Sequence, residues 1–271
     1  MKKILTLSLL AILGACASQP HQKLLVDSES KFFESESLWK RVSMEKSDHL
    51  LKECYQGDLS TFTENARKQY EKEAKSARYW NWVGNCLTWH GELKEARFFL
   101  GMALDLSKSN EEKAMVKNNL GVVYQRLGRV SLAYDSFKES HKMAPQFVSP
   151  AFNLAQLYLE QNLNQEALKI LNNSPFKDAK DAEVVHLKAL AYVQLKNLKD
   201  AGVHLSQIPS KFHTREDFAL TIGQWHLLSG RPQEALSLVK NLKSTGLKIP
   251  GQLSERIRRQ AEQLVAMSEK K

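Results

Sequence analysis

Cysteine, histidine and the carboxylates are the side chains through which this chain could perform nucleophilic, metal or acid–base chemistry. Its three cysteines and eight histidines are scattered over 271 residues, and neither the Cys-x-x-Cys nor the His-Glu-x-x-His spacing of metal sites occurs. We also find no phosphate-binding glycine loop, nucleophile–base pair or paired-carboxylate motif. We therefore expect no catalytic site, no metal, no cofactor and no small-molecule substrate.

The one cysteine with a recognisable context is Cys16, at the end of an export signal. Lys2 and Lys3 precede an apolar run from 4 to 13, which is followed by small residues. Ten apolar residues are too few to cross a bilayer, which takes about twenty. The sequence Leu13-Gly14-Ala15-Cys16 resembles the lipobox of bacterial lipoproteins. That resemblance implies a signal peptide over residues 1–15, cleavage before Cys16, and diacylglycerol on its sulfur with a further acyl chain, such as palmitate, on the new amino terminus.

The lipid would place the protein on a membrane, because two or more acyl chains suffice for stable anchoring. In the lipoprotein family an aspartate after the lipidated cysteine favours the inner membrane, whereas Ala17 stands there in this chain. The resemblance therefore implies the outer membrane, facing the periplasm, if the host is Gram-negative. Residues 16–42, with many polar side chains, are expected to form a mobile spacer. The alternative is an ordinary signal peptide with a chance cysteine.

The net charge does not by itself indicate a nucleic-acid partner. Removing residues 1–15 deletes Lys2 and Lys3 and no acid, so the formal charge falls from +9 to +7. The remaining basic residues are dispersed beside acids, as on a solvated helical surface. We therefore expect no nucleic acid among the partners.

A hexamer that ends in alanine recurs along the chain and sets its organisation. It reads GELKEA, GRVSLA, NLNQEA, KNLKDA and GRPQEA from positions 91, 128, 162, 196 and 230, so the steps are 37, 34, 34 and 34 residues. Seven residues before each hexamer stands a small residue: Gly84, Gly121, Ala155, Ala189 or Gly223. Small residues at these positions let two helices approach closely. A fixed period of this length is typical of helical repeat proteins.

The first residue of each hexamer is expected to end a helix. Glycine suits that position at 91, 128 and 230, because it adopts the left-handed conformation without strain. Asn162 is the next-best residue, and Asn197 is expected to take the role from Lys196. The extra three residues near 108–113 are expected to lengthen one turn between repeats.

The period of the repeat, together with the residue types at six positions of the second unit, resembles the tetratricopeptide repeat. The positions that carry this resemblance are Leu120, Gly121, Tyr124, Ala133, Phe137 and Pro145. The resemblance implies an all-α solenoid, a right-handed superhelix of antiparallel helix pairs, with five repeats between 77 and 249. The expected repeats are 77–110, 114–147, 148–181, 182–215 and 216–249. Residues 43–76 are expected to form a degenerate helical pair at the amino-terminal end, and 250–271 a capping helix that covers the last apolar face.

Tetratricopeptide domains hold extended peptides or partner helices on a concave face, so the resemblance implies a protein-interaction scaffold tethered by lipid. The architecture is similar to that of outer-membrane lipoproteins that assist pilus or secretin assembly. An adaptor that recruits cell-wall enzymes and a structural spacer between membrane and wall are the alternatives. Both alternatives use the same fold, so the sequence leaves them open.

Mapping the family's concave positions onto the first helices gives the candidate peptide-binding groove. Its members are Asn81, Asn85, Trp89, Asn118, Asn119, Gln125, Arg126, Phe152, Asn153 and Gln156, to which the third to fifth units add Glu160, His186, Gln194 and Gln224. Amide side chains offer donors and acceptors that suit an extended backbone. Alternatively, the asparagines solvate a helix face or satisfy helix ends.

Cys54 and Cys86 are candidates for a disulfide. In the repeat frame they lie on the first helices of adjacent units, about 200° apart on a helical wheel of 3.6 residues per turn. Facing positions are therefore conceivable in an oxidising compartment. The alternative is that both are small buried apolar residues.

Overall fold

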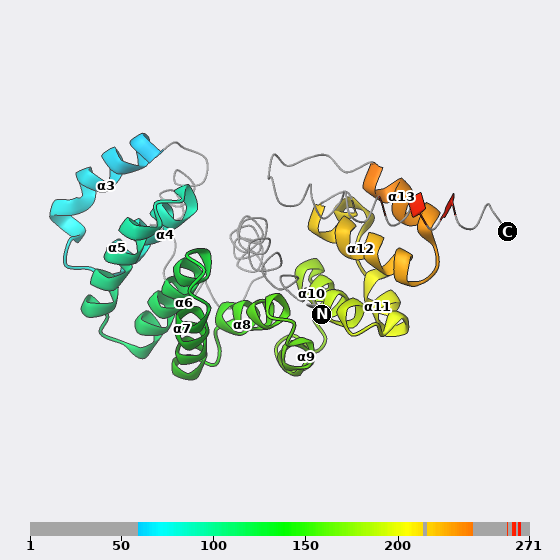
Figure 1. Ribbon diagram of the computed structural model, residues 1–271. Helices are drawn as coiled ribbons and strands as arrows, with labels where there is room; N and C mark the ends of the chain where they lie inside the picture. The colour runs from blue at the N-terminus through cyan, green and yellow to red at the C-terminus, as the bar shows by residue number, and fades with distance from the viewer. Residues whose placement is uncertain (1–58, 214–215, 241–258, 260–261, 264, 267–271) are drawn as a thin grey trace, which may run out of the picture. The chain divides into compact units, whose positions relative to one another are not determined.

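The computed structural model describes residues 59–213 and 216–240, together with residues 259, 262, 263, 265 and 266. All regular structure in these ranges is helical (Figure 1). The chain divides into two compact units, here called the N-terminal unit (Leu25–Leu157, described from residue 59) and the C-terminal unit (Tyr158–Lys271). The predicted all-α fold is confirmed.

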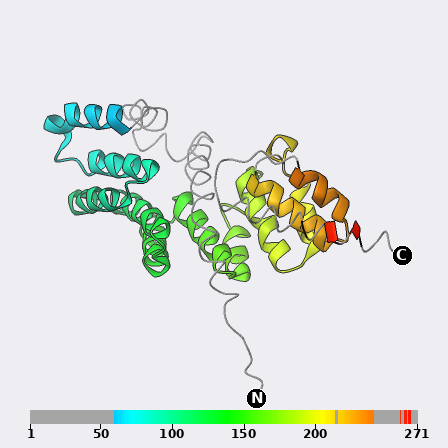
Figure 2. The ribbon, with the colours of Figure 1, turned by 45° about the horizontal axis from the view of Figure 1, so that its top comes forward.

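The N-terminal unit contains α3 to α7 and most of α8. Their bounds are α3 Leu59–Glu73, α4 Ala77–His90, α5 Leu93–Leu106, α6 Asn110–Arg126, α7 Val130–Met143 and α8 Val148–Glu160. Helix α4 packs on α5, and α6 packs on α7. Figure 2 shows these cyan-to-green helices as a stack of hairpins.

The C-terminal unit contains the end of α8 and the helices that follow. Their bounds are α9 Asn164–Leu171, α10 Ala182–Gln194, α11 Leu198–Leu205, the short 3₁₀ helix η1 Ser210–Phe212, α12 Glu216–Leu228 and α13 Pro232–Lys240. Helix α10 packs on α11 and α12 on α13. Their core includes Val185, Phe218 and Ile222.

The turns inside the hairpins have left-handed backbone conformations at the first residue of every hexamer. The φ angles are 91° at Gly91, 70° at Gly128, 59° at Asn162, 58° at Lys196 and 72° at Gly230. The expectation that Asn197 would replace Lys196 is therefore wrong. Asn197 instead caps the amino terminus of α11, where its side chain accepts a hydrogen bond from the Asp200 backbone N–H at 3.3 Å.

Two glycines in the first helices mark places where the paired helices touch. A Cβ atom at Gly84 would lie 2.5 Å from Cγ of Leu100, and one at Gly121 would lie 2.5 Å from Cε1 of Phe137. No side chain larger than hydrogen fits at these distances without movement of the neighbour. The small residues are therefore required by the packing of α4 on α5 and of α6 on α7.

The three-residue insertion lengthens a helix, which corrects the expectation of a longer turn. Helix α6 begins at Asn110, where a capping box joins Ser109 and Glu112: the Glu112 backbone N–H donates to the Ser109 hydroxyl at 3.1 Å, and the Ser109 backbone N–H donates to the Glu112 carboxylate at 3.3 Å. Only residues 107–109 connect α5 to α6. The helix therefore starts before position 114, because the inserted residues supply a good amino-terminal cap.

Aromatic residues join α3 to the first hairpin. The Phe62 and Trp82 ring centroids are 5.0 Å apart, and those of Tyr70 and Trp80 are 6.0 Å apart. The Tyr79 hydroxyl donates to the Ala66 carbonyl at 2.7 Å. Helix α3 thus packs against α4.

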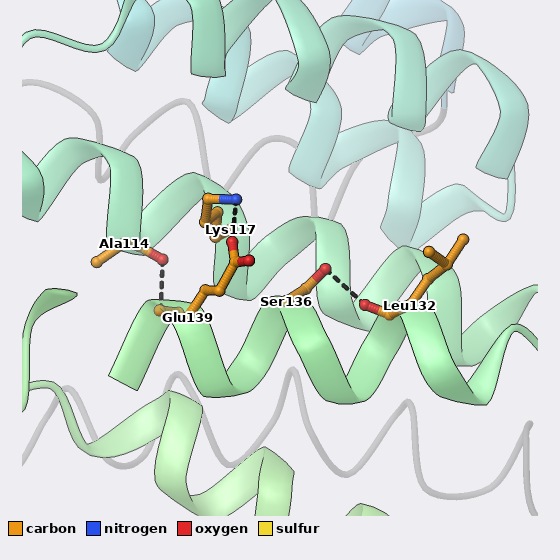
Figure 3. A network of polar contacts seen from close by, with 6 residues as sticks. Ala114, Lys117, Leu132, Ser136 and Glu139 are labelled. Atoms are coloured by element: carbon orange, nitrogen blue, oxygen red, sulfur yellow. Dashed lines mark hydrogen bonds and ion pairs between the residues drawn. The ribbon is translucent and has the colours of Figure 1, made fainter. Parts of the chain in front are cut away.

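Polar contacts join the two helices of the second hairpin, α6 and α7. Lys117 of α6 forms an ion pair with Glu139 of α7 (Figure 3). The Ser140 hydroxyl donates to the Ala114 carbonyl at 2.5 Å. The Ser136 hydroxyl, in contrast, bonds only within its own helix, to the Leu132 carbonyl at 2.7 Å.

Several predictions concern residues outside the described ranges: the signal peptide, Cys16, the spacer 16–42, Cys54, and the first part of the 43–76 pair. Of the expected capping helix 250–271, the five described residues are helical. Among the residues that the structure describes, no helix is both long and apolar enough to span a membrane.

Candidate functional site

Four of the predicted groove residues form a hydrogen-bonded ladder across α4, α6 and α8. The Asn153 Nδ2 donates to Asn118 Oδ1 at 2.9 Å, and the Asn118 Nδ2 donates to Asn119 Oδ1 at 3.3 Å. The Asn119 Nδ2 then donates to Asn81 Oδ1 at 2.8 Å. The amides therefore follow one another in a single direction across the first helices of three successive repeats.

The asparagine ladder (Asn81, Asn118, Asn119 and Asn153) is buried and uncharged. The exposed fractions of its members are 7%, 5%, 8% and 1%. Neutral amides avoid the desolvation penalty of a buried charge, yet each must find partners for its donor and acceptor. The ladder satisfies most of these groups within the protein, which explains how four polar side chains are tolerated between packed helices.

Unpaired polar atoms gather at the α8 end of the ladder. Within the part of the chain that the structure describes, the Asn153 Oδ1 has no hydrogen-bond partner, and neither does the Gln156 Oε1 or Nε2, although Gln156 is only 2% exposed. The two residues are three positions apart on a helix and therefore share a face. An unpaired buried polar group costs about 1–3 kcal/mol. Such groups mark the part of the ladder where an incoming ligand could supply the missing partners.

Helix α8 is apolar enough to hold these amides in place. Ala151, Leu154, Ala155 and Leu157 are buried at 7% exposure or less. Ala155 is the small residue predicted for close helix approach, and it is completely buried. The polar positions are thus fixed by a rigid, well-packed helix rather than by a loop.

Arg126 has a structural contact that the sequence did not indicate. Its guanidinium donates to the Thr88 carbonyl near the end of α4, and burial lowers its pKa. A cation at the carboxyl-terminal end of a helix is stabilised by the helix dipole. Arg126 therefore links two repeats, and Thr88, which the sequence analysis missed, is its partner.

Four further predicted groove residues lie on the helices of the ladder but are not members of it. Gln125 and Phe152 are buried, at 7% and 3% exposure, whereas Asn85 and Trp89 are half-buried. All four lie on the same first helices as the ladder: Asn85 and Trp89 on α4, Gln125 on α6 and Phe152 on α8.

A buried lysine organises the C-terminal unit and was also missed from the sequence. Lys188, 3% exposed, donates through Nζ to the Phe176 carbonyl at 2.8 Å and to the Lys177 carbonyl at 3.0 Å. Burial lowers the pKa of its ammonium group. Lys188 thereby holds the connection between α9 and α10, and a single lysine in a largely buried helix gives no sequence signal of this role.

Cys86 lies on α4 with no exposed surface and is part of a disulfide. Cys54 lies outside the described residues. Pairing of Cys54 with Cys86 therefore stays a prediction.

The comparisons with known proteins agree on the fold. A tetratricopeptide-repeat family model matches residues 125–191. A search of curated protein sequences finds no significant match. The chain is similar to the solved structure of YrrB, described as a TPR protein with an unusual peptide-binding site, with 17% identity over 72% of this chain and 97% of that chain and a TM-score of 0.51.

Two further solved structures share lower similarity. The APC/C hetero-tetramer Cut9–Hcn1 matches with 15% identity over 90% of this chain and 53% of that chain, at a TM-score of 0.46. Naa15/Naa10 bound to HypK-THB matches with 16% identity over 82% of this chain, at a TM-score of 0.42, and this chain spans only 34% of its length. The YrrB match and the family model over residues 125–191 show an all-α fold of tetratricopeptide-repeat helix pairs.

Proposed function

We propose that this tetratricopeptide-repeat chain is a protein-interaction scaffold that binds a peptide segment or helix of a partner at the α8 end of the asparagine ladder. The observation that carries the proposal is the set of unpaired amide atoms on Asn153 and Gln156. A polypeptide backbone or polar side chain brings N–H donors and C=O acceptors, which are the groups that these atoms lack. Binding would remove the cost of leaving them unpaired.

The chemistry of the ladder favours an internal segment over a free carboxyl terminus. Some tetratricopeptide domains clamp a terminal carboxylate with cations, but Asn81, Ser149 and Asn153 occupy the matching positions here. Recognition through neutral amides is also expected to depend little on salt concentration, because salt screens interactions between charges and neutral amides form none. The description of YrrB as having a peptide-binding site supports this class of function.

The test is partner binding by the purified chain with Gln156→Ala, after cross-linking in the native envelope has identified the partner. Loss of one or two hydrogen bonds worth about 0.5–1.5 kcal/mol each should weaken binding from about twofold to more than tenfold. Helicity should not change. The matched control is Gln146→Ala, because the exposed Gln146 bonds only to Glu111 at 3.4 Å.

The result that would contradict this location is full-strength binding by the Gln156→Ala protein. If binding is lost instead when Gln194 and Gln224 are replaced, the site lies in the C-terminal unit. Those two residues were predicted on the corresponding first helices and therefore make a fair alternative.

We also propose that the scaffold is tethered to the outer membrane through lipid on Cys16. The support is the Leu13–Cys16 motif and Ala17 after it. Cys16→Ser should abolish palmitate labelling and leave uncleaved precursor, whereas Ala17→Asp should keep the labelled protein in the inner membrane. A Cys16→Ser protein that still matures and partitions into detergent would contradict the tether.

A role in envelope assembly of the pilus or secretin type rests on the same tether and on the repeat architecture. Cross-linking of the acylated protein in its own envelope separates the alternatives. Capture of a secretin or pilus subunit supports assembly, a wall hydrolase supports the adaptor, and murein alone supports a spacer.

A further inference from the structure

The C-terminal unit brings together three side chains that can ligate a metal. Glu183 and His186 lie one turn apart on α10, and Asp217 lies at the start of α12, which packs against α10. One donor atom from each residue lies within 4.8 Å of the other two. This cluster is separate from the asparagine ladder and has no role in the proposed function.

The cluster lies inside the protein rather than on its surface. Glu183 is 2% exposed and His186 1%, while the side chain of Asp217 is 9% exposed. Two carboxylates and an imidazole nitrogen are a donor set that divalent metal ions take, and such an ion would favour the close approach of the two carboxylates. The partly exposed Asp217 gives such a cation a route from solvent.

The imidazole of His186 is oriented with its Nδ1 toward the cluster. Its Nε2 lies 2.8 Å from the Thr221 hydroxyl oxygen, and that hydroxyl donates its own proton to the Asp217 backbone carbonyl at 3.2 Å. Nδ1 lies 3.9 Å from the Asp217 carboxylate. In the tautomer in which the hydroxyl oxygen accepts the proton of Nε2, Nδ1 carries the lone pair that a metal ion needs. Phe218 stacks on the ring at 4.2 Å and holds its plane.

We propose that Glu183, His186 Nδ1 and Asp217 form a binding site for a divalent transition-metal ion of the zinc class. Imidazole with carboxylates suits zinc, cobalt and nickel, and three protein ligands leave a fourth position for water. Thr221 acts as the outer hydrogen-bond partner that fixes the histidine tautomer, as is usual for metal-ligating histidines. Metal–donor distances of about 2.0–2.2 Å require the three donors to close in by rotation of the carboxylate side chains. The ion would fasten α12 to α10.

The test is titration of the metal-free, full-length protein with Co²⁺, followed by the visible absorption of the bound ion and by the melting temperature. One equivalent should bind with the intense bands of a four-coordinate site, raise the melting temperature, and be displaced by Zn²⁺. Asp217→Asn, which changes the least buried ligand, and His186→Gln should each abolish this equivalent. Thr221→Val should lower the affinity about 10- to 100-fold, because only the outer partner is lost.

His204→Gln and His226→Gln serve as matched controls, since each removes a half-buried histidine of the same unit outside the cluster. Both should keep the full equivalent of Co²⁺. The proposal is overturned if the unaltered protein binds no equivalent, or if Asp217→Asn, shown by circular dichroism to be folded, binds as tightly as the unaltered protein. Since partner binding is not measured, failure here leaves the proposed function unaffected.

Discussion

Replacing Asn118 with leucine should destabilise the N-terminal unit, because Asn118 is the residue through which the asparagine ladder passes from α8 to α6. Leucine has a similar branched shape, so the change removes hydrogen bonds with little change in volume. The bonds lost are the 2.9 Å bond from Asn153 and the 3.3 Å bond to Asn119. The Asn153 amide would then lack any described partner, because its Oδ1 is already unpaired.

The size of the effect follows from the groups that are left behind. Two buried groups, the Asn153 Nδ2 and the Asn119 Oδ1, lose their partners at about 1–3 kcal/mol each. The longer bond is the weaker one, which places its share at the low end of that range. Burial of the new leucine returns about 1.5–3 kcal/mol. A mid-range value for the one group and a low-end value for the other, about 3 kcal/mol lost in all, against about 2 kcal/mol returned, give a net loss of about 1 kcal/mol in the free energy of unfolding. Asn81→Leu, which breaks only one bond, should cost less.

The assay is urea unfolding followed by tryptophan fluorescence. Three tryptophans, at 80, 82 and 89, lie on α4 and report on the N-terminal unit. A repeat protein need not unfold in one step, so the midpoint of the transition sensed by these residues is the quantity to compare. Ser136→Ala is the control, because its exposed hydroxyl bonds only to a carbonyl of its own helix (Figure 3); it should stay within about 0.5 kcal/mol of the unaltered protein. An Asn118→Leu protein as stable as this control would show that the ladder bonds stabilise the unit by no more than leucine burial does, and the reasoning would fail.

Further substitutions test the packing, the turns and the pH dependence. Gly121→Ala should lower the unfolding free energy by about 1–3 kcal/mol in the same assay, because its Cβ would lie 2.5 Å from the facing aromatic ring; Gly101→Ala, with nothing within 4 Å, should raise it by up to about 1 kcal/mol through helix propensity. Lys196→Gly should raise the melting temperature, because it removes a left-handed lysine whose backbone strain is about 1–2 kcal/mol. The greater backbone entropy of glycine in the unfolded chain offsets part of this gain. An unchanged melting temperature would show that the strain is absent. Burial lowers the pKa values of His204 and His226, so the unfolded chain binds more protons and stability should fall as the pH drops below about 6.5; replacing both with glutamine should flatten this acid limb in melting curves.

Periodic features of the sequence predicted the fold because they depend on contacts that every repeat makes in the same way. The small residues at Gly84 and Gly121 meet the facing helix at van der Waals limits, so their spacing reveals the hairpin directly. The left-handed turns at Gly91, Gly128 and Gly230 follow from the conformational freedom of glycine. These requirements are local, and a single sequence displays them.

Two kinds of feature were not predictable in the same way: a conformation that opposes the residue's own preference, and a contact that depends on the distance between repeats. Lys196 adopts a left-handed conformation that its own preference opposes, because the surrounding hairpin imposes it. Sequence placed the ladder asparagines on first helices, but whether they bond to each other or to a ligand depends on the spacing of those helices to within an ångström. Asp217 joins Glu183 and His186 only because α12 packs on α10, and no short motif spans that separation.

The direction of the ladder connects the stability of the N-terminal unit with the proposed binding. Its three hydrogen bonds all run in the same direction, with the donor on the Asn153 side and the acceptor on the Asn81 side. Hydrogen bonds arranged head to tail polarise one another, so each strengthens the next. The unpaired Asn153 Oδ1 is the place where one more donor would extend this chain. A partner N–H that binds there would therefore tighten the bonds from α8 through α6 to α4. The binding energy would thus be shared across three repeats, although the partner touches only the last of them.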